Sequence, residues 1–271
     1  MLGTLIEQVV GKRFDIYQRE NILTQLETRA DYVPSNLPAD ELELLGTLYQ
    51  KKNPSGKWNE SDDWFPQMDN DLNTRLVVAD TITLQNPYAS SSRDKTSTLQ
   101  NDETSFDLSD YVVGTNASSL SPQGGLRISF DELAHTLEML LGGGNLRGKK
   151  ILSDNSFQEM LSVQWKYNGS NGDTCNGVML SYGLGFYNVG GESSARLCRD
   201  SVINLVGHTG SAFGFLGGLF LTKNTADGFV YMMNGEPVEK DINSRSHGKF
   251  SCNYIWEEQV SNAICKFLNS H

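Results

Sequence analysis

Four short apolar runs, closely spaced and marked by glycine, dominate the sequence from residue 182 to residue 235. Their sequences are YGLGFYNVG, VINLVGH, FGFLGGLFLT and GFVYMMNG. Runs of this length and composition are typical of β-strands. The turns between them are too short to hold a helical crossover, so we expect the strands to be antiparallel neighbours in one sheet.

Helical periodicity marks much of the remaining chain. Apolar residues spaced three and four apart predict an amphipathic helix at the start, followed by helices over 14–26, 38–50 and 254–268. The residues that define the first of these helices are Leu2, Leu5, Ile6, Val9 and Val10. Residues 51–70 and 89–110 are polar or rich in turn-forming residues, and we expect them to form loops.

Two serines have the spacing of helix caps. Ser129, with Glu132 three residues later, forms a capping-box pattern ahead of a run of leucines that ends at three glycines, 142–144. Ser153 precedes another short apolar-polar pattern and is expected to be the N-cap of that helix. Together the elements predict an α+β fold in one domain over 1–271, with a mainly helical lobe over 1–125 and a lobe of helices and antiparallel sheet over 126–271.

Charge and hydropathy exclude several classes of partner. The net charge is −11, with no basic stripe, which argues against nucleic acid and against docking on anionic lipid. The longest strongly apolar stretch, Phe213 to Leu221, is too short to span a bilayer. The first residues, MLGTLIEQVVGKRF, lack the basic start and the small-residue cleavage site of a signal peptide.

The four cysteines favour an oxidising compartment. They show no C-x-x-C spacing, so we expect no zinc site, and their even number permits two disulfides. Three connectivities are open; proximity favours Cys252–Cys265 and Cys175–Cys198. Three Asn-x-Ser sequons are compatible with secretion, and their asparagines are Asn59, Asn116 and Asn168.

The triplet His208-Thr209-Gly210 places a titratable ring, a hydroxyl and a bare backbone position together between two apolar runs. The triplet is one of several motifs that follow one another in a characteristic order along the chain. The segment SPQGGLRISFDELAHTLEMLLGGGNLRGKKILSDNSFQEML is followed by YGLGF and then by GHTGSAFGFLGGLFL and GFVYMMNG. The opening LGTLIEQVVGKRFDIYQRENIL completes the set. In this order they resemble the serine β-lactamase and penicillin-binding-protein superfamily, nearest to its class C and esterase-like branch, over most of the chain except 51–110.

The resemblance implies roles for four residues. His208, at the position of the family's Lys/His-Thr-Gly triplet, would set the electrostatics and proton traffic of the site and is the candidate catalytic residue. Thr209 would hydrogen-bond a substrate carboxylate or carbonyl, and Gly210 would let the substrate lie against the strand. The backbone N–H near Ser211 would be one of two oxyanion-hole donors. No metal and no organic cofactor is implied.

The nucleophile of this family is the serine of a Ser-x-x-Lys motif, and its position in this chain needs a separate argument. Ser92-Arg-Asp-Lys95, Ser153-Asp-Asn155 and His208-Thr-Gly reproduce the family's motif order. A nucleophilic serine opens a buried helix, whereas Ser92 lies in a polar stretch and Asp94 would keep Lys95 protonated. We therefore reject Ser92, although a literal active site of Ser92, Lys95, Ser153 and His208 remains one alternative.

The first helix suggests where the nucleophile lies instead. It resembles the helix that follows the family's Tyr-x-Asn motif, and it begins without a capping residue. This places Ser-x-x-Lys and Tyr-x-Asn upstream of Met1 and predicts an incomplete fold that is inactive alone. The upstream segment or another chain would cover the sheet. The whole protein would be a secreted or periplasmic hydrolase of an amide or ester, acting on a small-molecule or peptide acyl substrate. The alternative is a non-catalytic descendant that keeps the pocket wall for binding.

Overall fold

The computed structural model describes residues 1–53, 55–67, 81–83, 105–108, 111–175, 177–190, 197–198, 203–223, 227–239, 247–249 and 251–270. Two compact units make up the chain. The first unit comprises Met1–Thr47 and Met68–Glu132, and the second comprises Leu48–Gln67 and Leu133–His271. The division between residues 1–125 and 126–271 stays a prediction.

The first unit is mainly helical. Its elements are α1 (Leu2–Val10), α2 (Phe14–Gln18), a π-helix (Arg19–Leu23), two 3-10 helices (Pro34–Asn36 and Ala117–Leu120), α3 (Ala39–Leu42) and the paired strands β3 (Thr81–Thr83) and β4 (Ser105–Asp107). A small core of Phe14, Val33, Ala117 and Leu120 holds α2 against the later segment. The predicted helices at the start and over 14–26 are thus confirmed.

Helix α1 is amphipathic as predicted, but three of its apolar side chains face solvent. Leu2, Leu5 and Val9 are 76%, 53% and 78% exposed, while Glu7 is fully buried. The Glu7 carboxylate accepts hydrogen bonds from the Phe14 N–H at 2.8 Å and the Tyr111 hydroxyl at 2.7 Å. A third bond comes from the Gly114 N–H at 2.8 Å. Three donors compensate the burial of this charge, and they fix which side of α1 faces inward.

The second unit contains the main sheet. Six strands follow the order β12-β11-β10-β9-β8-β7, and all of their pairings are antiparallel. Their bounds are β7 (Trp165–Lys166), β8 (Ser181–Tyr182), β9 (Tyr187–Val189), β10 (Leu205–Ala212), β11 (Phe215–Thr222) and β12 (Gly228–Asn234). The antiparallel sheet and the α+β class are confirmed. The run predicted as one strand over 182–190 divides into β8 and β9, because Gly185 turns the chain at φ +84°.

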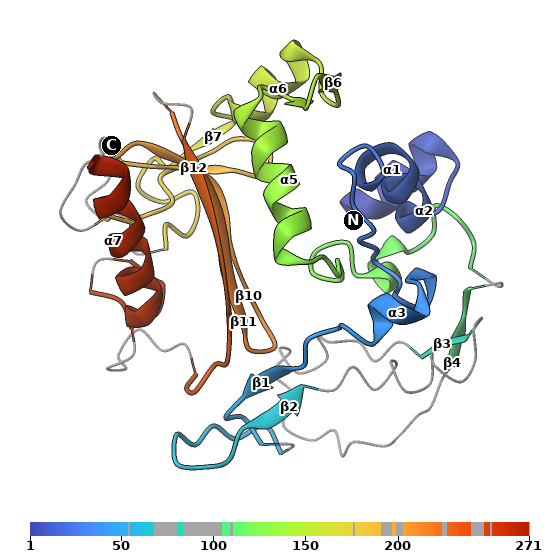
Figure 1. Ribbon diagram of the computed structural model, residues 1–271, viewed down its shortest axis with the longest axis horizontal. Helices are drawn as coiled ribbons and strands as arrows, with labels where there is room; N and C mark the ends of the chain where they lie inside the picture. Colours follow the sequence, from blue (N-terminus) through green and yellow to red (C-terminus); the bar gives the residue numbers. More distant parts are fainter. Residues whose placement is uncertain are drawn as a thin grey trace. The chain divides into compact units, whose positions relative to one another are not determined.

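Helices cover both faces of this sheet, and α5 and α7 lie on opposite sides of it (Figure 1). Helix α7 (Ile255–Asn269) confirms the predicted last helix and packs Val260, Ile264 and Leu268 on a core that includes Phe220 and Tyr231. Helix α5 (Phe130–Leu141) approaches the other face, where a Cβ at Gly228 would lie 2.7 Å from Leu137.

The smaller elements of this unit include both predicted caps. The Glu132 N–H donates to Ser129 Oγ at 3.2 Å, and the Ser156 N–H donates to Ser153 Oγ at 3.0 Å at the start of α6 (Asp154–Leu161). The hairpin of β5 (Asn145–Leu146) and β6 (Lys149–Lys150) separates α5 from α6.

The helix predicted over 38–50 is wrong beyond its first turn. Helix α3 ends at Leu42, and β1 (Leu48–Gln50) pairs with β2 (Phe65–Gln67) within the region expected to be a loop. The segment after β12 explains the extended conformation. Tyr49 donates its N–H to Asn234 Oδ1 at 3.1 Å and accepts the Glu236 N–H at 3.0 Å. These partners are distant in sequence, so local periodicity could not reveal them.

Two disulfides form, but their connectivity differs from the one that proximity along the sequence favoured. Cys175 bonds Cys252 and Cys198 bonds Cys265. The expected pairs Cys252–Cys265 and Cys175–Cys198 are therefore wrong. Cys265 lies within α7, whose buried side faces the sheet, and there it meets Cys198 rather than the cysteine that precedes the helix.

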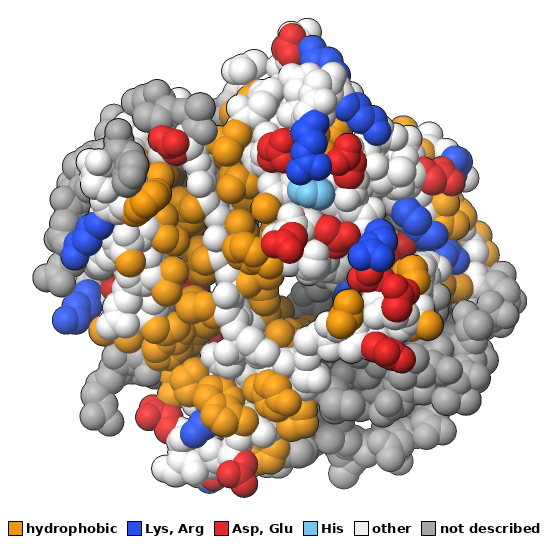
Figure 2. All heavy atoms as spheres, viewed as in Figure 1, with side chains coloured by type: hydrophobic (Ala, Val, Ile, Leu, Met, Phe, Trp, Pro, Cys, Tyr) orange, Lys and Arg blue, Asp and Glu red, His pale blue; other side chains and the backbone are white. Residues whose placement is uncertain are grey.

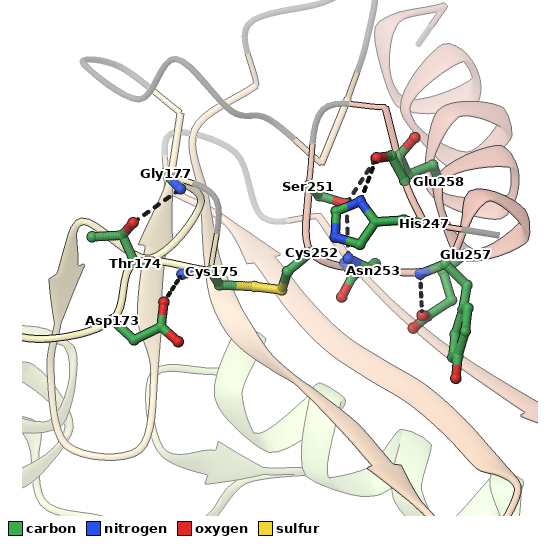
Figure 3. The surroundings of a disulfide bond; sticks show 12 residues. Asp173, Thr174, Cys175, Gly177, His247, Ser251, Cys252, Asn253, Glu257 and Glu258 are labelled. Carbon is green, nitrogen blue, oxygen red and sulfur yellow. Dashed lines mark hydrogen bonds between the residues drawn. A yellow bond between two sulfur atoms is a disulfide. The ribbon is translucent and has the colours of Figure 1, made fainter. Parts of the chain in front are cut away.

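A buried polar cluster orders the loop beside the first disulfide (Figure 3). Glu258 accepts a hydrogen bond from Ser251 Oγ at 2.8 Å and one from the Lys249 N–H at 2.8 Å. The Asn253 N–H donates to Ser251 Oγ at 3.1 Å. Next to this cluster, Glu257 accepts the Tyr254 N–H at 2.9 Å and caps α7. The network holds Cys252 in place at the entry to the helix.

Candidate functional site

The candidate site is the half of β10 that extends beyond the end of β9. Strand β9 pairs with β10 only from Leu205 to Gly207, whereas β11 pairs with β10 as far as Ala212. Within the part of the chain that the structure describes, the His208-Thr209-Gly210-Ser211 stretch therefore has a strand neighbour on one side only. All four site residues that the resemblance implies lie here in consecutive order.

The hydrogen-bond alternation along β10 decides which backbone groups face away from β11. The Lys223 N–H donates to the Asn204 carbonyl at 3.0 Å, which marks residues 204 and 223 as a hydrogen-bonded pair. Such pairs alternate along an antiparallel ladder, so even-numbered residues of β10 bond to β11. The N–H and C=O groups of Thr209 and Ser211 consequently point away from β11. Among the described residues, none accepts a hydrogen bond from the Ser211 backbone N–H on that side.

His208 is exposed, and its ring lies beside two tyrosines. Ring centroids are 5.8 Å apart for Tyr182 and 5.5 Å apart for Tyr187, both in edge-on geometry. The ring atom Nδ1 lies against the Thr209 carbonyl oxygen. A nitrogen that faces a carbonyl carries the proton, so in the neutral imidazole Nε2 keeps its lone pair. The ring is therefore held in place with one nitrogen able to accept a proton.

Thr209 contacts the core rather than open solvent. Its side chain hydrogen-bonds the hydroxyl of Tyr187, which is 1% exposed and packs against Phe220. Burial raises the pKa of Tyr187 above its usual value, and the bond with Thr209 opposes this only in part. The Tyr187 hydroxyl therefore stays protonated at neutral pH and does not supply a phenolate base.

The glycines of this region separate into two groups. A Cβ at Gly207 would lie 2.1 Å from the Leu219 carbonyl oxygen, and one at Gly218 would lie 2.6 Å from the Tyr231 ring. Packing requires glycine at both positions. A Cβ at Gly210 would meet only the Phe215 ring at 3.6 Å, which is an ordinary contact. Gly210 is also exposed, so packing does not require glycine at this position.

The hairpin that carries the site ends in a two-residue turn. Phe213 and Gly214 both have positive φ, at 53° and 91°, as in a type I′ turn. A Cβ at Gly214 would lie 2.1 Å from the Tyr49 carbonyl oxygen, so the strand–strand contact with β1 also requires glycine here. This turn fixes the register of β10 against β11 and thereby the direction of the Ser211 N–H.

Sequence reasoning missed Tyr182 and Tyr187 as parts of the site. Both lie at the ends of the run YGLGFY, and only the β8–β9 turn brings their rings to His208. Ser92 and Lys95 lie outside the described residues. Ser153 is the N-cap of α6, as its sequence context predicted. Within the described parts of the chain, no three potential metal ligands are clustered and no helix is long and apolar enough to cross a membrane.

Comparisons with known proteins find similarity at the level of structure. No protein-family model matches the sequence, and no curated protein does. A penicillin-binding-protein homologue from Pyrococcus abyssi, an octamer, is 18% identical, with a TM-score of 0.48 over 87% of this chain and 37% of that one. A D-stereospecific amidohydrolase from Streptomyces sp. is 15% identical, with a TM-score of 0.46 over 87% and 48%. A penicillin-binding protein from Bacillus halodurans is 12% identical, with a TM-score of 0.49 over 97% and 53%.

The chain spans between 37% and 53% of the length of these solved structures.

Proposed function

We propose that residues 1–271 form the C-terminal portion of a β-lactamase-related serine hydrolase and that β10 is one wall of its acyl-transfer site. The observation that carries this proposal is the backbone of Ser211. Its N–H faces away from β11 beside Gly210, a glycine that packing does not require. A backbone donor next to an accessible strand surface is the arrangement that an oxyanion hole needs.

The chemistry would proceed through an acyl-serine. A serine hydroxyl attacks the carbonyl carbon of an amide or ester, its proton passes to a base, and the carbonyl oxygen takes up negative charge. The Ser211 N–H donates to that oxygen, while Gly210 leaves room for the acyl group. His208 transfers protons at the edge of the site through Nε2. Collapse of the intermediate releases the protonated amine or alcohol, and water then hydrolyses the acyl-serine ester.

The nucleophile is proposed to lie outside residues 1–271, in a Ser-x-x-Lys helix, because Ser92 lies in a polar stretch beside Asp94. The chain alone is then inactive. The substrate would be a small-molecule or peptide acyl compound, and the polypeptide that carries the nucleophile, or another chain, would cover the sheet. Two disulfides support a secreted or periplasmic location.

One observation favours the alternative of a binding protein without catalysis. The Thr209 side chain, expected to hold substrate, is engaged with Tyr187 in the core. A pseudoenzyme could keep β10 as a binding surface while the hydroxyl of Thr209 has a structural role. The two functions differ in whether an acyl-enzyme ever forms.

Acylation by a fluorescent penicillin and by a p-nitrophenyl ester distinguishes the hydrolase from the binding protein. We expect no burst of acylation from purified residues 1–271. The protein purified from its native source should have a larger mass than residues 1–271 and should be labelled stoichiometrically. A burst from residues 1–271 that is lost in Ser92→Ala would overturn the proposed position of the nucleophile. A native product that has the mass of residues 1–271 and does not label would favour the binding protein.

The role of Ser211 has its own matched pair of variants, made in the native polypeptide. Ser211→Pro removes the N–H at a position that does not bond to β11, whereas Ser211→Ala keeps it. We expect Ser211→Pro to slow acylation by about 10²–10³-fold and Ser211→Ala to leave it within about threefold. Equal rates in both variants would exclude this N–H as the oxyanion donor.

A further inference from the structure

The three Asn-x-Ser sequons of the sequence have no part in the proposed acyl-transfer site. Their asparagines, Asn59, Asn116 and Asn168, are all exposed. Asn-x-Ser is the acceptor motif for an N-linked oligosaccharide, which needs a surface position in a secreted protein. Exposure of the asparagine does not separate the three, but the hydrogen bonds, burial and charge around each sequon do.

Asn168 lies in an exposed loop, two residues after the end of β7. All three residues of its sequon, Asn168, Gly169 and Ser170, are exposed. The Ser170 N–H donates to Asn168 Oδ1 at 3.0 Å, and the Ser170 hydroxyl donates to the same oxygen at 3.4 Å. This turn holds the serine hydroxyl of the sequon next to the carboxamide that would be modified.

A second asparagine, three residues later, gives this loop its shape. Asn171 Nδ2 donates to the Lys166 carbonyl at 3.0 Å, and Asn171 Oδ1 accepts the Asn168 N–H at 2.9 Å. Asn168 Nδ2, in contrast, donates to none of the residues that the structure describes. A sugar that replaces one hydrogen of Asn168 Nδ2 therefore breaks no hydrogen bond among these residues.

The other two sequons are built into the fold. Asn59 Nδ2 donates to Asp62 Oδ1 at 2.5 Å, so the atom that would bear the sugar already has a partner. In the sequon of Asn116, the middle residue Ala117 is fully buried and donates its N–H to Thr4 Oγ1 at 3.1 Å. Of the three sequons, only the one at Asn168 combines full exposure with a free Nδ2 among the described residues.

We propose that Asn168 carries an N-linked oligosaccharide. The donor is an oligosaccharide joined through its anomeric carbon to a lipid pyrophosphate. Asn168 Nδ2 forms a bond to the anomeric carbon, and the bond between that carbon and the pyrophosphate oxygen breaks. The lipid pyrophosphate leaves with the electron pair, and one Nδ2 proton passes to a base of the transferase. The product is a neutral, strongly hydrated group on the loop after β7.

The charge near the sequons also favours Asn168. The donor is anionic, so carboxylates beside the acceptor repel it. Three carboxylates, those of Glu60, Asp62 and Asp63, follow Asn59 within four residues, and Figure 2 shows acidic side chains on the β1–β2 hairpin. The loop of Asn168 follows a lysine at position 166, and its first carboxylate is Asp173.

A glycan at Asn168 rests on the secreted location in the proposed function, but not on its acyl-transfer step. The same loop leads to Cys175, whose disulfide with Cys252 belongs to an oxidising compartment (Figure 3). The secretory lumen of eukaryotes is such a compartment, and proteins are N-glycosylated there. The disulfide and the glycan are thus two marks of one location within a single loop.

Peptide mass spectrometry of the protein purified from its native source tests the proposal. Peptide N-glycosidase releases N-linked oligosaccharides and converts the acceptor asparagine to aspartate, which takes up heavy oxygen from isotopically labelled water. We expect the mass of the intact protein to fall on treatment and heavy aspartate to occur at position 168. An unmodified Asn168, or a glycan on Asn59 or Asn116 alone, would overturn the proposal.

Two variants at one position, made in the native polypeptide, provide a matched pair. Ser170→Ala removes the hydroxyl of the sequon and keeps Asn168, and we expect loss of the glycan. Ser170→Thr keeps a hydroxyl and should be glycosylated like the parent protein. Asn168→Gln is the second test if Ser170→Ala does not fold, and it should lose the same mass. A glycan that persists in Ser170→Ala or Asn168→Gln would contradict the assignment.

Non-reducing digestion of the same sample separates failure of the glycan from failure of the location. A bare Asn168 together with the Cys175–Cys252 bond overturns the glycan and leaves the secreted location standing. A bare Asn168 together with free Cys175 and Cys252 thiols overturns both. Acyl-enzyme labelling is measured separately, so the outcome for Asn168 does not decide whether the site acylates.

Discussion

The hydroxyl of Tyr187 shares a hydrogen bond with the side chain of Thr209, just past the last residue of β10 that pairs with β9. The bond joins the buried aromatic core under α7 to the strand that carries the candidate site. Through this bond, the core residue Tyr187 holds the side chain of the threonine in the His-Thr-Gly triplet. The position of His208 depends on the same two residues, since its ring contacts Tyr187 and its Nδ1 faces the Thr209 carbonyl.

Removing this hydroxyl tests how far the core supports the site. Tyr187→Phe keeps the ring in place and should lower the free energy of unfolding by about 1 kcal/mol, the usual value of a buried neutral hydrogen bond. Urea unfolding followed by tryptophan fluorescence measures the change. Tyr182→Phe is the matched control next to the same imidazole and should change stability by less than about 0.5 kcal/mol. Equal effects in the two variants would contradict the assigned bond.

The glycines of β10 should respond differently to an added methyl group. Gly207→Ala would force a Cβ against the Leu219 carbonyl, and we expect a loss of more than about 2 kcal/mol. Gly210→Ala meets only ordinary contact and should stay within about 0.5 kcal/mol of the parent chain. Urea midpoints at an unchanged m-value give both numbers. A large loss in Gly210→Ala would mean that packing, rather than ligand access, requires that glycine.

The turn at the tip of the β10–β11 hairpin can be improved. Phe213 has φ 53° and is 49% exposed, so it occupies a left-handed conformation without the benefit of burial. Asparagine is favoured at this position of a type I′ turn, and Phe213→Asn should stabilise the protein by about 0.5–1 kcal/mol. Differential scanning calorimetry measures the shift in Tm. Gly214→Ala, whose Cβ would meet the Tyr49 carbonyl, should destabilise it instead.

The two disulfides should differ in how quickly a reductant reaches them. Cys198 and Cys265 are each 2% exposed, whereas Cys175 and Cys252 are half-buried beside the loop in Figure 3. In native buffer with dithiothreitol, we expect Cys175 and Cys252 to be alkylated first, as peptide mass spectrometry would show. The double variant Cys198→Ala/Cys265→Ala should lose about 2–5 kcal/mol of stability. Simultaneous reduction of both bonds under these conditions would show that exposure does not control access.

Alkaline pH should destabilise the fold through its buried tyrosines. Burial raises the pKa of Tyr231 and of Tyr254, and Tyr254 also lies 2.5 Å from Glu236 Oε1. Unfolded tyrosines lose their protons near pH 10, so above this pH the folded state binds more protons than the unfolded state. The free energy of unfolding therefore falls as the pH rises above 10, by about 1.4 kcal/mol per pH unit for each such tyrosine.

Urea unfolding between pH 9 and pH 11 measures this slope. Tyr254→Phe should make the slope shallower, whatever its effect on stability at pH 8. An unchanged slope would show that Tyr254 ionises alike in the folded and the unfolded chain.

Local sequence determined the strands, their antiparallel pairing, the two serine caps, the last helix and the place of the His-Thr-Gly triplet on a strand. These features depend on periodicity, turn length and capping chemistry, all of which act over a few neighbouring residues. Tertiary structure decided the rest. Tyr49 is extended because it bonds to Asn234, Glu7 is buried because Tyr111 and Gly114 donate to it, and Cys265 meets Cys198 because α7 packs on the sheet. Each of these outcomes depends on partners that lie far away in the sequence, and only the folded chain brings them together.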